Sequence, residues 1–529
     1  MPVIDGAMQD YSLTLDKFID HAAKWHPDTQ VVTALDGGGS SRIGYAGLRD
    51  RAARVSSALV GLGAARGDCV ATLAWNTQSH IECWYGIMGI GAICHTLNPR
   101  LTTDQLAWML DCSEASILFV SADLENLANT ILRSAKNVRK MVIIDGDPRP
   151  STHAEAWIRM TFDELLATGV ADVPWGDFPE KAPCGLCFTS GTTGLPKGVV
   201  YTHRGNYLHT LRQAQADVSG ILSRDVILPV VPMCHANAWG LPFVAPATGA
   251  KLVLPGRHAD GPHLARLIAD EGVTVGVAVP TVWLGLFDYL EESGMQVPTL
   301  RRVMVGGAPM PQTLVARIES RGIEVQTTWG MTELSPLGTA MPPNSGSRDA
   351  RLSGKPAVGL DLRLADGSGK PLLNQREVEG HLWARGHSVV ERYLGQTETA
   401  SRDGWFDTGD LALIDRRGFL AITGRAKDLI KSGGEWINPA EIEALVSSLP
   451  DVALAAVVGR ADPKWGERPV LFVELNDGMQ PSDEDLLAPL RGKVANWWIP
   501  DAIVRLESMP LAATGKIDTL RLRMEYSRR

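Results

Sequence analysis

Stretches with helical periodicity alternate with short apolar runs along most of this chain, and this alternation limits the folds open to it. The segment Tyr45–Asp68 has apolar residues at helical spacing, contains glycines near its end and leads into the apolar run "CVATLAW". Similar runs follow as "ASILFVS", "MVIIDG", "VTVGVAVP" and "RRVMVGG". Strands that alternate with helices form largely parallel sheets covered on both faces. The sequence therefore predicts an α/β fold built of layered subdomains.

The sequence pattern changes near Gly359, where strand-like segments such as "VEGHLWARG" and "GFLAITG" are separated by turn residues. After Lys427 comes a last block of about 100 residues, a size that suits a small domain. This block contains the strand-like runs "VALAAVVG" and "RPVLFVEL" and the helix-like segment "DLLAPLRGKVANWW". We therefore expect a large N-terminal domain over 1–426, with a β-rich subdomain at about 359–426, and a small α+β C-terminal domain over 427–529.

Charge and composition exclude several classes of function. The net charge is −9, and no basic run is interleaved with aromatic residues, which disfavours a nucleic-acid-binding surface. The uncharged apolar stretch Gly272–Phe287 is shorter than the roughly 20 residues of a membrane-spanning helix, and we expect it in the core. The seven cysteines are expected to be free thiols. Cys184 and Cys187 form a CxxC pattern, but we expect them to pack in a short strand and not to form a metal or redox site. With no targeting signal at either end, a cytoplasmic location is expected.

The loop "TSGTTGLPKG", Thr189–Gly198, combines glycines, hydroxyl side chains and a lysine. A Walker loop would need a glycine at position 196 and a Ser or Thr after the lysine, but Pro196 and Gly198 stand there. The loop follows a strand-like run, and the ends of strands are where α/β proteins usually bind ligands. Because glycines let the backbone approach an anion while hydroxyls and the lysine bind it, the loop predicts a phosphate site of another type.

The extended motif "FTSGTTGLPKGVVYTHRG" resembles the phosphate loop of the acyl-adenylate-forming superfamily. The resemblance continues in order through "VPMCHANAW", "VGGAPM", "TTWGMTELSP", "WFDTGD", "GRAKDLIKSGGEWINPAEIE" and "ATGKI". "HANAWG", "WGMTELSPLGT" and "DLIKSGGEWI" are most similar to bacterial medium- and long-chain fatty-acid CoA ligases and to methylmercaptopropionate-CoA ligases. The resemblance covers nearly the whole chain.

This resemblance implies a two-step reaction that uses ATP, Mg²⁺ and CoA. A carboxylate attacks the α-phosphate of ATP and expels pyrophosphate, and a thiol then attacks the acyl adenylate and releases AMP. Both steps develop anionic charge, which is stabilised by positioned cations and donors. By resemblance, Glu333 holds Mg²⁺ together with Thr192, Thr332 touches the α-phosphate, and Lys516 is the catalytic lysine that reaches both the acyl carboxylate and the α-phosphate.

The remaining nucleotide and CoA contacts are also implied by the matched motifs. One carboxylate can accept hydrogen bonds from both hydroxyls of a ribose, which is the role expected for Asp410 with the help of Arg425. The full expected set is Thr189, Ser190, Gly191, Thr192, Thr193, Gly194 and Lys197 for phosphate; Gly306, Gly307, Ala308, Pro309, Thr328, Trp329, Gly330 and Met331 around the base; Asp410, Arg425, Lys427, Lys431 and Trp436; and Ser432, Gly433 and Gly434 for pantetheine.

The family rotates its C-terminal domain between the two steps, so the 427–529 domain is expected to be mobile, with Lys427 as its hinge. For Lys431 and Trp436, a solvated lysine and a packed tryptophan remain open alternatives to nucleotide contact. His235 and Trp239 match a gate beside the acyl tunnel of the fatty-acid ligases, and a core role for the histidine stays open.

The acid is expected to be a monocarboxylic one, namely a medium-chain fatty acid or a short alkyl or alkylthio acid, because no basic residue is identifiable in the pocket from the sequence. An aryl acid such as a cinnamate is the alternative. Loading of a separate carrier protein and nucleotide binding without activity are the other functions considered. The resemblance also favours a homodimer.

Overall fold

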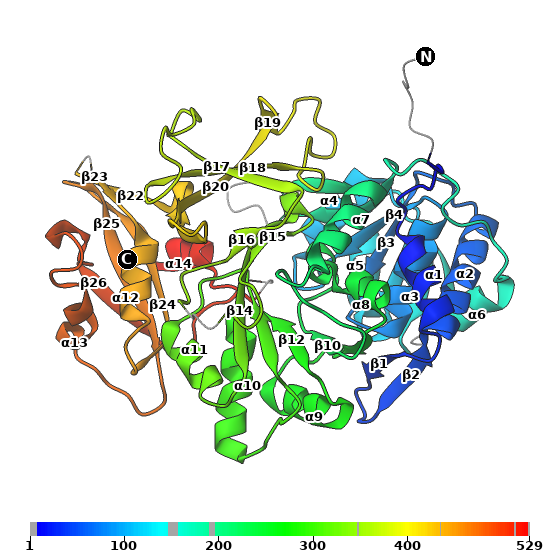
Figure 1. Cartoon of the computed structure of the whole chain (residues 1–529), viewed down its shortest axis with the longest axis horizontal. Coiled ribbons are helices and arrows are strands. Elements are labelled where there is room, and N and C mark those ends of the chain that lie inside the picture. The colour runs from blue at the N-terminus through cyan, green and yellow to red at the C-terminus, as the bar shows by residue number, and fades with distance from the viewer. Residues whose placement is uncertain are drawn as a thin grey trace.

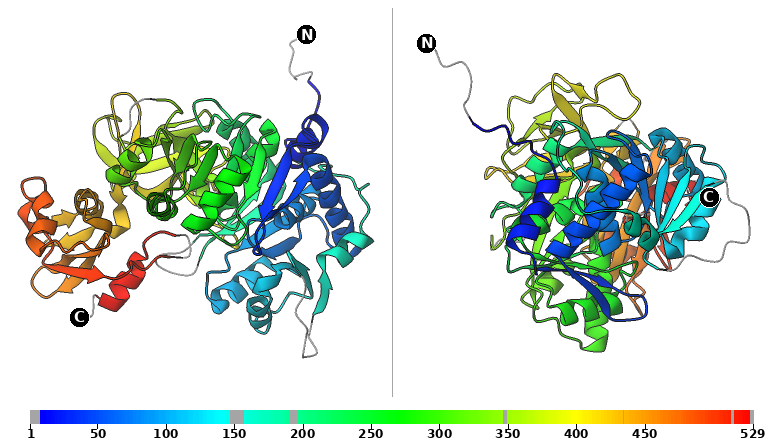
Figure 2. Two further views of the ribbon diagram at one scale, coloured as in Figure 1. Left: turned by 90° about the horizontal axis from the view of Figure 1, so that it is seen from below. Right: turned by 90° about the vertical axis from the view of Figure 1, so that its right-hand side faces the viewer.

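The computed structural model describes residues 8–146, 157–189, 196–345, 349–433, 435–512 and 515–526. Four sheets follow one another across the molecule (Figure 1). The blue and cyan segments of the N-terminal part lie on the right, the green and yellow segments in the middle, and the orange and red C-terminal part on the left. The left view in Figure 2 keeps this order, with the C-terminal part at one end of the molecule.

The first sheet has seven strands in the order β7-β6-β5-β3-β4-β8-β9, and all neighbours pair in parallel except β8 and β9. Three of the predicted apolar runs form its centre. Its strands are β3 (Cys69–Leu73), β4 (Ile93–Leu97), β5 (Ile117–Ser121), β6 (Lys140–Ile144), β7 (Ile158–Thr161), β8 (Pro183–Phe188) and β9 (Gly198–Thr202).

The second sheet has nine strands in the order β16-β15-β14-β13-β12-β10-β11-β1-β2. The five strands from β14 to β11 and the next strand β1 run parallel, while β2, β15 and β16 are antiparallel additions at the two edges. Its strands are β1 (Gln30–Ala34), β2 (Ser40–Gly44), β10 (Val226–Pro229), β11 (Lys251–Leu254), β12 (Val275–Ala278), β13 (Arg302–Val305), β14 (Glu324–Gly330), β15 (Leu337–Ala340) and β16 (Lys355–Pro356).

Helices cover both parallel sheets, and the largest buried cluster joins residues of the two sheets with α1, α2, α3 and α8. Val70 of the first sheet, Val31 and Ile227 of the second, and Trp84 and Phe243 of the helices belong to it. The helices are α1 (Asp16–Trp25), α2 (Tyr45–Gly61), α3 (Gln78–Gly89), α4 (Thr103–Ser113), α5 (Glu125–Leu132), α6 (Phe162–Thr168), α7 (His203–Gln213), α8 (Leu241–Thr248), α9 (Gly261–Glu271), α10 (Pro280–Ser293) and α11 (Gln312–Glu319). The predicted α/β layers are thus confirmed.

The third and fourth sheets are smaller and mostly antiparallel. The third contains β17 (Leu360–Ala365), β18 (Glu379–Gly386), β19 (Ser401–Arg402), β20 (Trp405–Ile414) and β21 (Leu420–Arg425). The fourth contains β22 (Ile430–Ser432), β23 (Glu435–Ile437), β24 (Val452–Asp462), β25 (Gly466–Leu475) and β26 (Ala502–Leu506), and α12 (Pro439–Val446), α13 (Asp483–Leu487) and α14 (Thr519–Tyr526) belong to the same part of the chain. Lys427 lies in the short helix η4 (Ala426–Asp428) between these two sheets.

One local expectation is wrong. The segment from Asp485 to Trp498 is not a continuous helix, because α13 ends at Leu487 and only the short 3₁₀ turns η5 (Ala488–Leu490) and η6 (Asn496–Trp498) follow. Pro489 cannot donate the hydrogen bond that an α-helix needs, and Gly492 has a positive φ of 71°. Within the described residues, no helix has the length and apolar character to cross a bilayer.

Candidate active site

The ends of strands from three sheets meet at one cleft, which runs between the large N-terminal part of the chain and the C-terminal part. Its lining includes Thr189 after β8, Gly307 after β13, Trp329 at the end of β14, Asp410 of β20, Arg425 of β21 and Lys516. Most of the predicted nucleotide residues in the described part of the chain are therefore brought together, although they are spread over more than 300 positions of the sequence.

Asp410 and Arg425 face each other as paired residues of two antiparallel strands. Arg425 Nε lies 3.0 Å from Asp410 Oδ1, and the indole N–H of Trp329 donates to Asp410 Oδ2 at 2.8 Å. Burial raises the pKa of the Asp410 carboxyl, and the Arg425 guanidinium, the indole and Lys516 oppose that shift. The sequence predicts a contact between Trp329 and the base, and the structure shows that the indole also orients the Asp410 carboxylate.

Two glycines after β13 open the wall of the cleft opposite this carboxylate. A Cβ on Gly306 would lie 2.4 Å from Thr328 Oγ1, and a Cβ on Gly307 would lie 3.2 Å from Lys516 Cε. Gly307 also has a φ of 83°, which side chains rarely tolerate. The two glycines therefore let Thr328, Trp239 and Lys516 lie close to the backbone at this wall of the cleft.

Glu333 lies in the short helix η3 (Thr332–Leu334), directly after the turn at Gly330 and Met331. The hydroxyl of Tyr393 donates to Glu333 Oε1 at 3.0 Å, and the Tyr201 hydroxyl donates to the Thr332 carbonyl at 2.9 Å. Burial raises the pKa of Glu333, which is opposed by Tyr393, Arg425 and Lys197. The described residues contain no group of three side chains that could hold a metal. Mg²⁺ usually takes only one or two carboxylates and keeps water and substrate phosphate as its other ligands, so a single carboxylate such as Glu333 is compatible with this cation.

The phosphate loop is fixed at its two ends by the β8–β9 hairpin. The Thr189 amide donates to the Lys197 carbonyl at 2.9 Å, and the Lys197 amide donates to the Thr189 hydroxyl at 3.3 Å. The ammonium of Lys197 lies 4.8 Å from the centre of the Tyr393 ring. Ser190, Gly191, Thr192, Thr193 and Gly194 lie outside the described residues, as does Gly434 of the pantetheine segment.

Lys516 enters the cleft from the C-terminal part of the chain. Burial lowers the pKa of its ammonium group to about 8, helped by Arg425 and opposed by Asp410. His235 lies near enough for the charge of Lys516, together with burial, to lower the imidazole pKa to about 4. The His235 imidazole is therefore neutral at physiological pH, and Lys516 is the cationic member of this pair.

His235 is followed by a turn in an uncommon conformation. Ala236, Asn237, Ala238 and Trp239 have φ angles of 45°, 57°, 46° and 54°, and Gly240 follows at 78°. The Trp239 carbonyl accepts a hydrogen bond from Gln213 Nε2 at 2.9 Å, and the buried indole lies against Gly306. The left-handed turn, residues 236–240, thus places Trp239 beside the glycine wall.

Comparison with known proteins identifies the family of this chain. The model of the AMP-binding enzyme family matches residues 19–394, and that of the AMP-binding enzyme C-terminal domain matches residues 441–516. The chain belongs to the AMP-binding enzyme family. It is 40% identical to the 3-methylmercaptopropionyl-CoA ligase of Ruegeria pomeroyi, over 98% of both chains. It is 38% identical to the medium-chain-fatty-acid–CoA ligase of Ectopseudomonas oleovorans, over 98% of this chain and 97% of that relative.

A solved structure shares the fold. The ATP-bound chimera B3 of RpMatB and BxBclM is 25% identical and has a TM-score of 0.84, with 98% of this chain and 99% of that chain covered. The expected family and the expected mixed α/β fold are therefore confirmed.

Not every predicted residue of this AMP-binding enzyme lies at the cleft. Lys431 and Trp436 are exposed cross-strand partners on the β22–β23 hairpin, with the ammonium 5.4 Å from the ring centre. Ser432 is buried in the same hairpin, and the Gly433 amide donates to the Trp465 carbonyl at 2.7 Å. In Figure 1 this hairpin lies at the outer left of the molecule, away from the strand ends that form the cleft.

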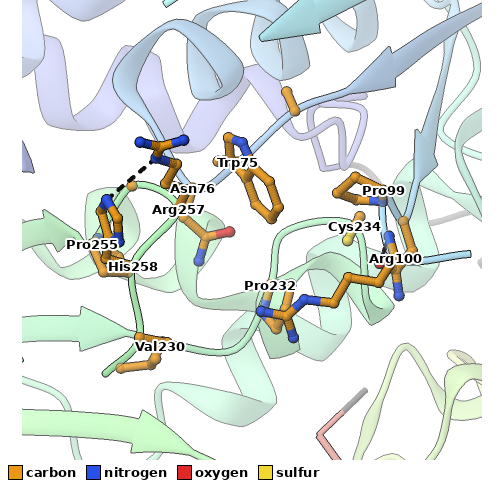
Figure 3. A pocket seen from close by; sticks show the side chains of 14 residues that line it. Trp75, Asn76, Pro99, Arg100, Val230, Pro232, Cys234, Pro255, Arg257 and His258 are labelled. Carbon is orange, nitrogen blue, oxygen red and sulfur yellow. Dashed lines mark hydrogen bonds between the residues drawn. The ribbon is translucent and has the colours of Figure 1, made fainter. Parts of the chain in front are cut away.

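The sequence interpretation missed Tyr393, which links Glu333 to Lys197. Tyr393 lies 60 residues after Glu333 and outside the quoted motifs, so no spacing pattern indicates their contact. It also missed a second, smaller pocket, which shares Asn98, Arg100 and Cys234 with the cleft. Figure 3 shows Arg100 on one side of this pocket and the hydrogen-bonded pair Arg257 and His258 on the other.

Proposed function

We propose that this AMP-binding enzyme is an ATP-dependent acyl-CoA ligase that activates a monocarboxylic acid. The observation that carries the proposal is the convergence of Lys516, Asp410 and Arg425 on one cleft beside the glycine that follows β13. Glu333 does not line this cleft, but it lies near enough to Arg425 for the guanidinium to oppose the rise of its carboxyl pKa. The names of the relatives, a methylmercaptopropionyl-CoA ligase and a medium-chain-fatty-acid–CoA ligase, support the same reaction.

In the first step, the Asp410 carboxylate accepts hydrogen bonds from the ribose hydroxyls of ATP, and Trp329 and Arg425 keep this carboxylate oriented. The base lies against the backbone of 306–309, and Lys197 binds the terminal phosphates. Magnesium held by Glu333 supplies positive charge to the phosphates when it is bound. Lys516 then stabilises the negative charge that develops as a carboxylate oxygen bonds to the α-phosphorus and pyrophosphate leaves. The product is an acyl adenylate.

In the second step, the thiol of CoA attacks the acyl carbon, and AMP leaves with the electron pair of the broken bond. Lys516 occupies the cleft, so the thiol needs a different arrangement of the C-terminal domain. We infer a division into an N-terminal domain, 1–426, and a mobile C-terminal domain, 427–529, with Lys427 as the hinge. Rotation would then move Ser432 and Gly433 towards the cleft. Arg100, which lines both the cleft and the pocket in Figure 3, supports a phosphate-bearing acceptor such as CoA over a bare thiol.

The acid is inferred to be a medium-chain fatty acid or a short alkyl or alkylthio acid. A neutral His235 and the indole of Trp239 beside the glycine wall suit an uncharged chain. An aryl acid is the second candidate, because a planar ring also fits a wall of glycine and indole.

A substrate panel tests the proposal. The enzyme is incubated with ATP, Mg²⁺ and octanoate, 3-methylmercaptopropionate, butyrate or cinnamate, with CoA or with a phosphopantetheinylated carrier protein. We expect pyrophosphate release with one class of acid and thioester only with CoA. The Lys516→Ala variant should lose pyrophosphate release while it still converts a supplied acyl adenylate to thioester. Thioester on the carrier alone, or no pyrophosphate with any acid, contradicts the proposal.

A further inference from the structure

The loop that carries Lys516 rests on the first turn of α10, a helix of the N-terminal part of the chain. Thr281 Oγ1 donates a hydrogen bond to the carbonyl oxygen of Gly515 at 2.9 Å, across 234 positions of sequence. Gly515 has a φ of 80°, and a Cβ there would lie 3.2 Å from Val279 Cγ2. The backbone just before the catalytic lysine is thus in close contact with α10.

The same loop is closed on itself, so an anchor at Gly515 also fixes its neighbour. The Ala512 amide donates to the Lys516 carbonyl at 2.7 Å, and Leu511 and Ile517 form a β-bridge. From this base the Lys516 side chain passes Gly307 and enters the cleft. The position of the ammonium group therefore depends on where the loop meets α10.

We propose that Thr281 is a positioning residue for acyl-adenylate formation, whose hydroxyl holds Gly515 and thereby Lys516 in the cleft. This inference rests on the proposed ligase function. The hydrogen bond joins two parts of the chain that separate when the C-terminal domain rotates. It stabilises the arrangement that forms the adenylate and contributes nothing to the arrangement that forms the thioester.

The size of the effect follows from the single bond that is lost. An intramolecular hydrogen bond between uncharged groups changes an equilibrium by about 2- to 10-fold. Replacing threonine by valine keeps the branched shape and removes only the hydroxyl, whereas serine keeps the hydroxyl. Thr130 offers a matched control, because its hydroxyl donates to the Asn126 carbonyl at 2.9 Å on the exposed face of α5, far along the chain from the cleft.

The test compares the two half-reactions in Thr281→Val, Thr281→Ser and Thr130→Val. Pyrophosphate release is measured with ATP, Mg²⁺ and octanoate or 3-methylmercaptopropionate, and thioester formation is measured with CoA and octanoyl-AMP. We expect Thr281→Val to lower kcat for pyrophosphate release about 2- to 10-fold, with KM for the acid and the thioester rate unchanged. Thr281→Ser should retain the wild-type rate, and Thr130→Val should match wild type in both assays.

Other results overturn the inference. An equal loss in both half-reactions would mean that Thr281 supports the fold only, and a rise in KM for the acid at constant kcat would make it a substrate contact. Unchanged kinetics in Thr281→Val would show that the bond does not position Lys516. If the wild-type enzyme releases no pyrophosphate with any acid, the proposed function itself fails, which is a separate and recognisable result.

Discussion

Burial disfavours the charged ammonium form of Lys516. Its surroundings include the cationic Arg425, which disfavours the ammonium form, and the carboxylate of Asp410, which favours it. The outcome is a pKa of about 8, well below the ordinary value for lysine. A lysine tuned in this way changes charge within the range of common assays.

We expect the adenylation step to lose rate at alkaline pH. The ammonium form is the active one, so kcat/KM for ATP should be constant below a pH of about 8 and fall above it, because this ratio reports the free enzyme. The alkaline fall of kcat should occur at a higher pH than that of kcat/KM, since bound phosphate favours the protonated form of Lys516. Pyrophosphate release measured from pH 6 to 10 checks this. Lys516→Arg, if it retains activity, should lack the limb, and a limb that persists in this variant would assign it to another group.

Tyr393 is the second residue whose contacts predict a measurable effect. Its hydroxyl is a donor to Glu333, and it lies beneath the ammonium of Lys197. Without the hydroxyl, Glu333 loses a hydrogen bond that orients its carboxylate, as partners of metal-binding carboxylates do. We expect Tyr393→Phe to raise the half-saturating Mg²⁺ concentration roughly 3- to 10-fold. Titration of pyrophosphate release with MgCl₂ at fixed ATP measures it, with Tyr289→Phe as control; an unchanged Mg²⁺ dependence would contradict the role of Tyr393.

At the scale of elements, the left-handed turn is the least ordinary piece of backbone. A left-handed conformation costs an L-residue with a Cβ about 1–2 kcal/mol, and four such residues follow one another before Gly240. Contacts with Gln213 and the glycine wall hold the turn in place. Strained backbone that persists beside a site is typical of functional segments.

Two alanine-to-glycine substitutions, which should change the free energy of unfolding in opposite directions, test this strain. Ala238→Gly should raise the free energy of unfolding by up to about 1 kcal/mol, because glycine adopts a positive φ without a steric cost. Ala247→Gly, in the right-handed helical backbone of α8, should lower it by about 1 kcal/mol. Urea denaturation of both variants measures the difference. A loss of stability in Ala238→Gly as large as that in Ala247→Gly would show that the turn is not strained.

Elements with a strong period could be read from the sequence, and conformations fixed by distant contacts could not. Apolar runs such as "MVIIDG" predict β6 because burial on both faces leaves a local signal. The "ANAW" segment carries no glycine at the four strained positions, so nothing local indicates a left-handed turn. Thr281 and Tyr393 meet their partners only through the packing of separate elements, whereas Lys516, Glu333 and Asp410 could be located because they stand inside motifs.

At the scale of the whole molecule, the C-terminal part is connected to the rest through a short segment at Lys427. Asn438 Nδ2 donates to the Thr423 carbonyl at 2.7 Å, so the first helix of the C-terminal part docks directly on β21. Burial and the neighbouring Arg425 lower the pKa of Lys427. The proposed hinge therefore lies next to Asp410 and Arg425, the pair that we propose binds the ribose.

Fixing the backbone at this position should separate the two half-reactions. Lys427→Pro locks φ near −65°, a value compatible with the 3₁₀ turn in which Lys427 lies, and resists the dihedral change that rotation needs. We expect pyrophosphate release to stay within about 2-fold of wild type and thioester formation to fall by at least about 100-fold. Lys427→Ala is the control and should retain both activities, while an equal loss in both assays of the proline variant would contradict the hinge.

The place of Lys516 beside Gly307 bears on the order in which the substrates react. In the proposed function, the domain that carries this lysine must rotate before CoA can react, so adenylation and thiol attack use the cleft at different times. Pyrophosphate then departs before the second acceptor engages. ATP and CoA therefore act in sequence at one cleft, and the position of a single lysine separates the two reactions.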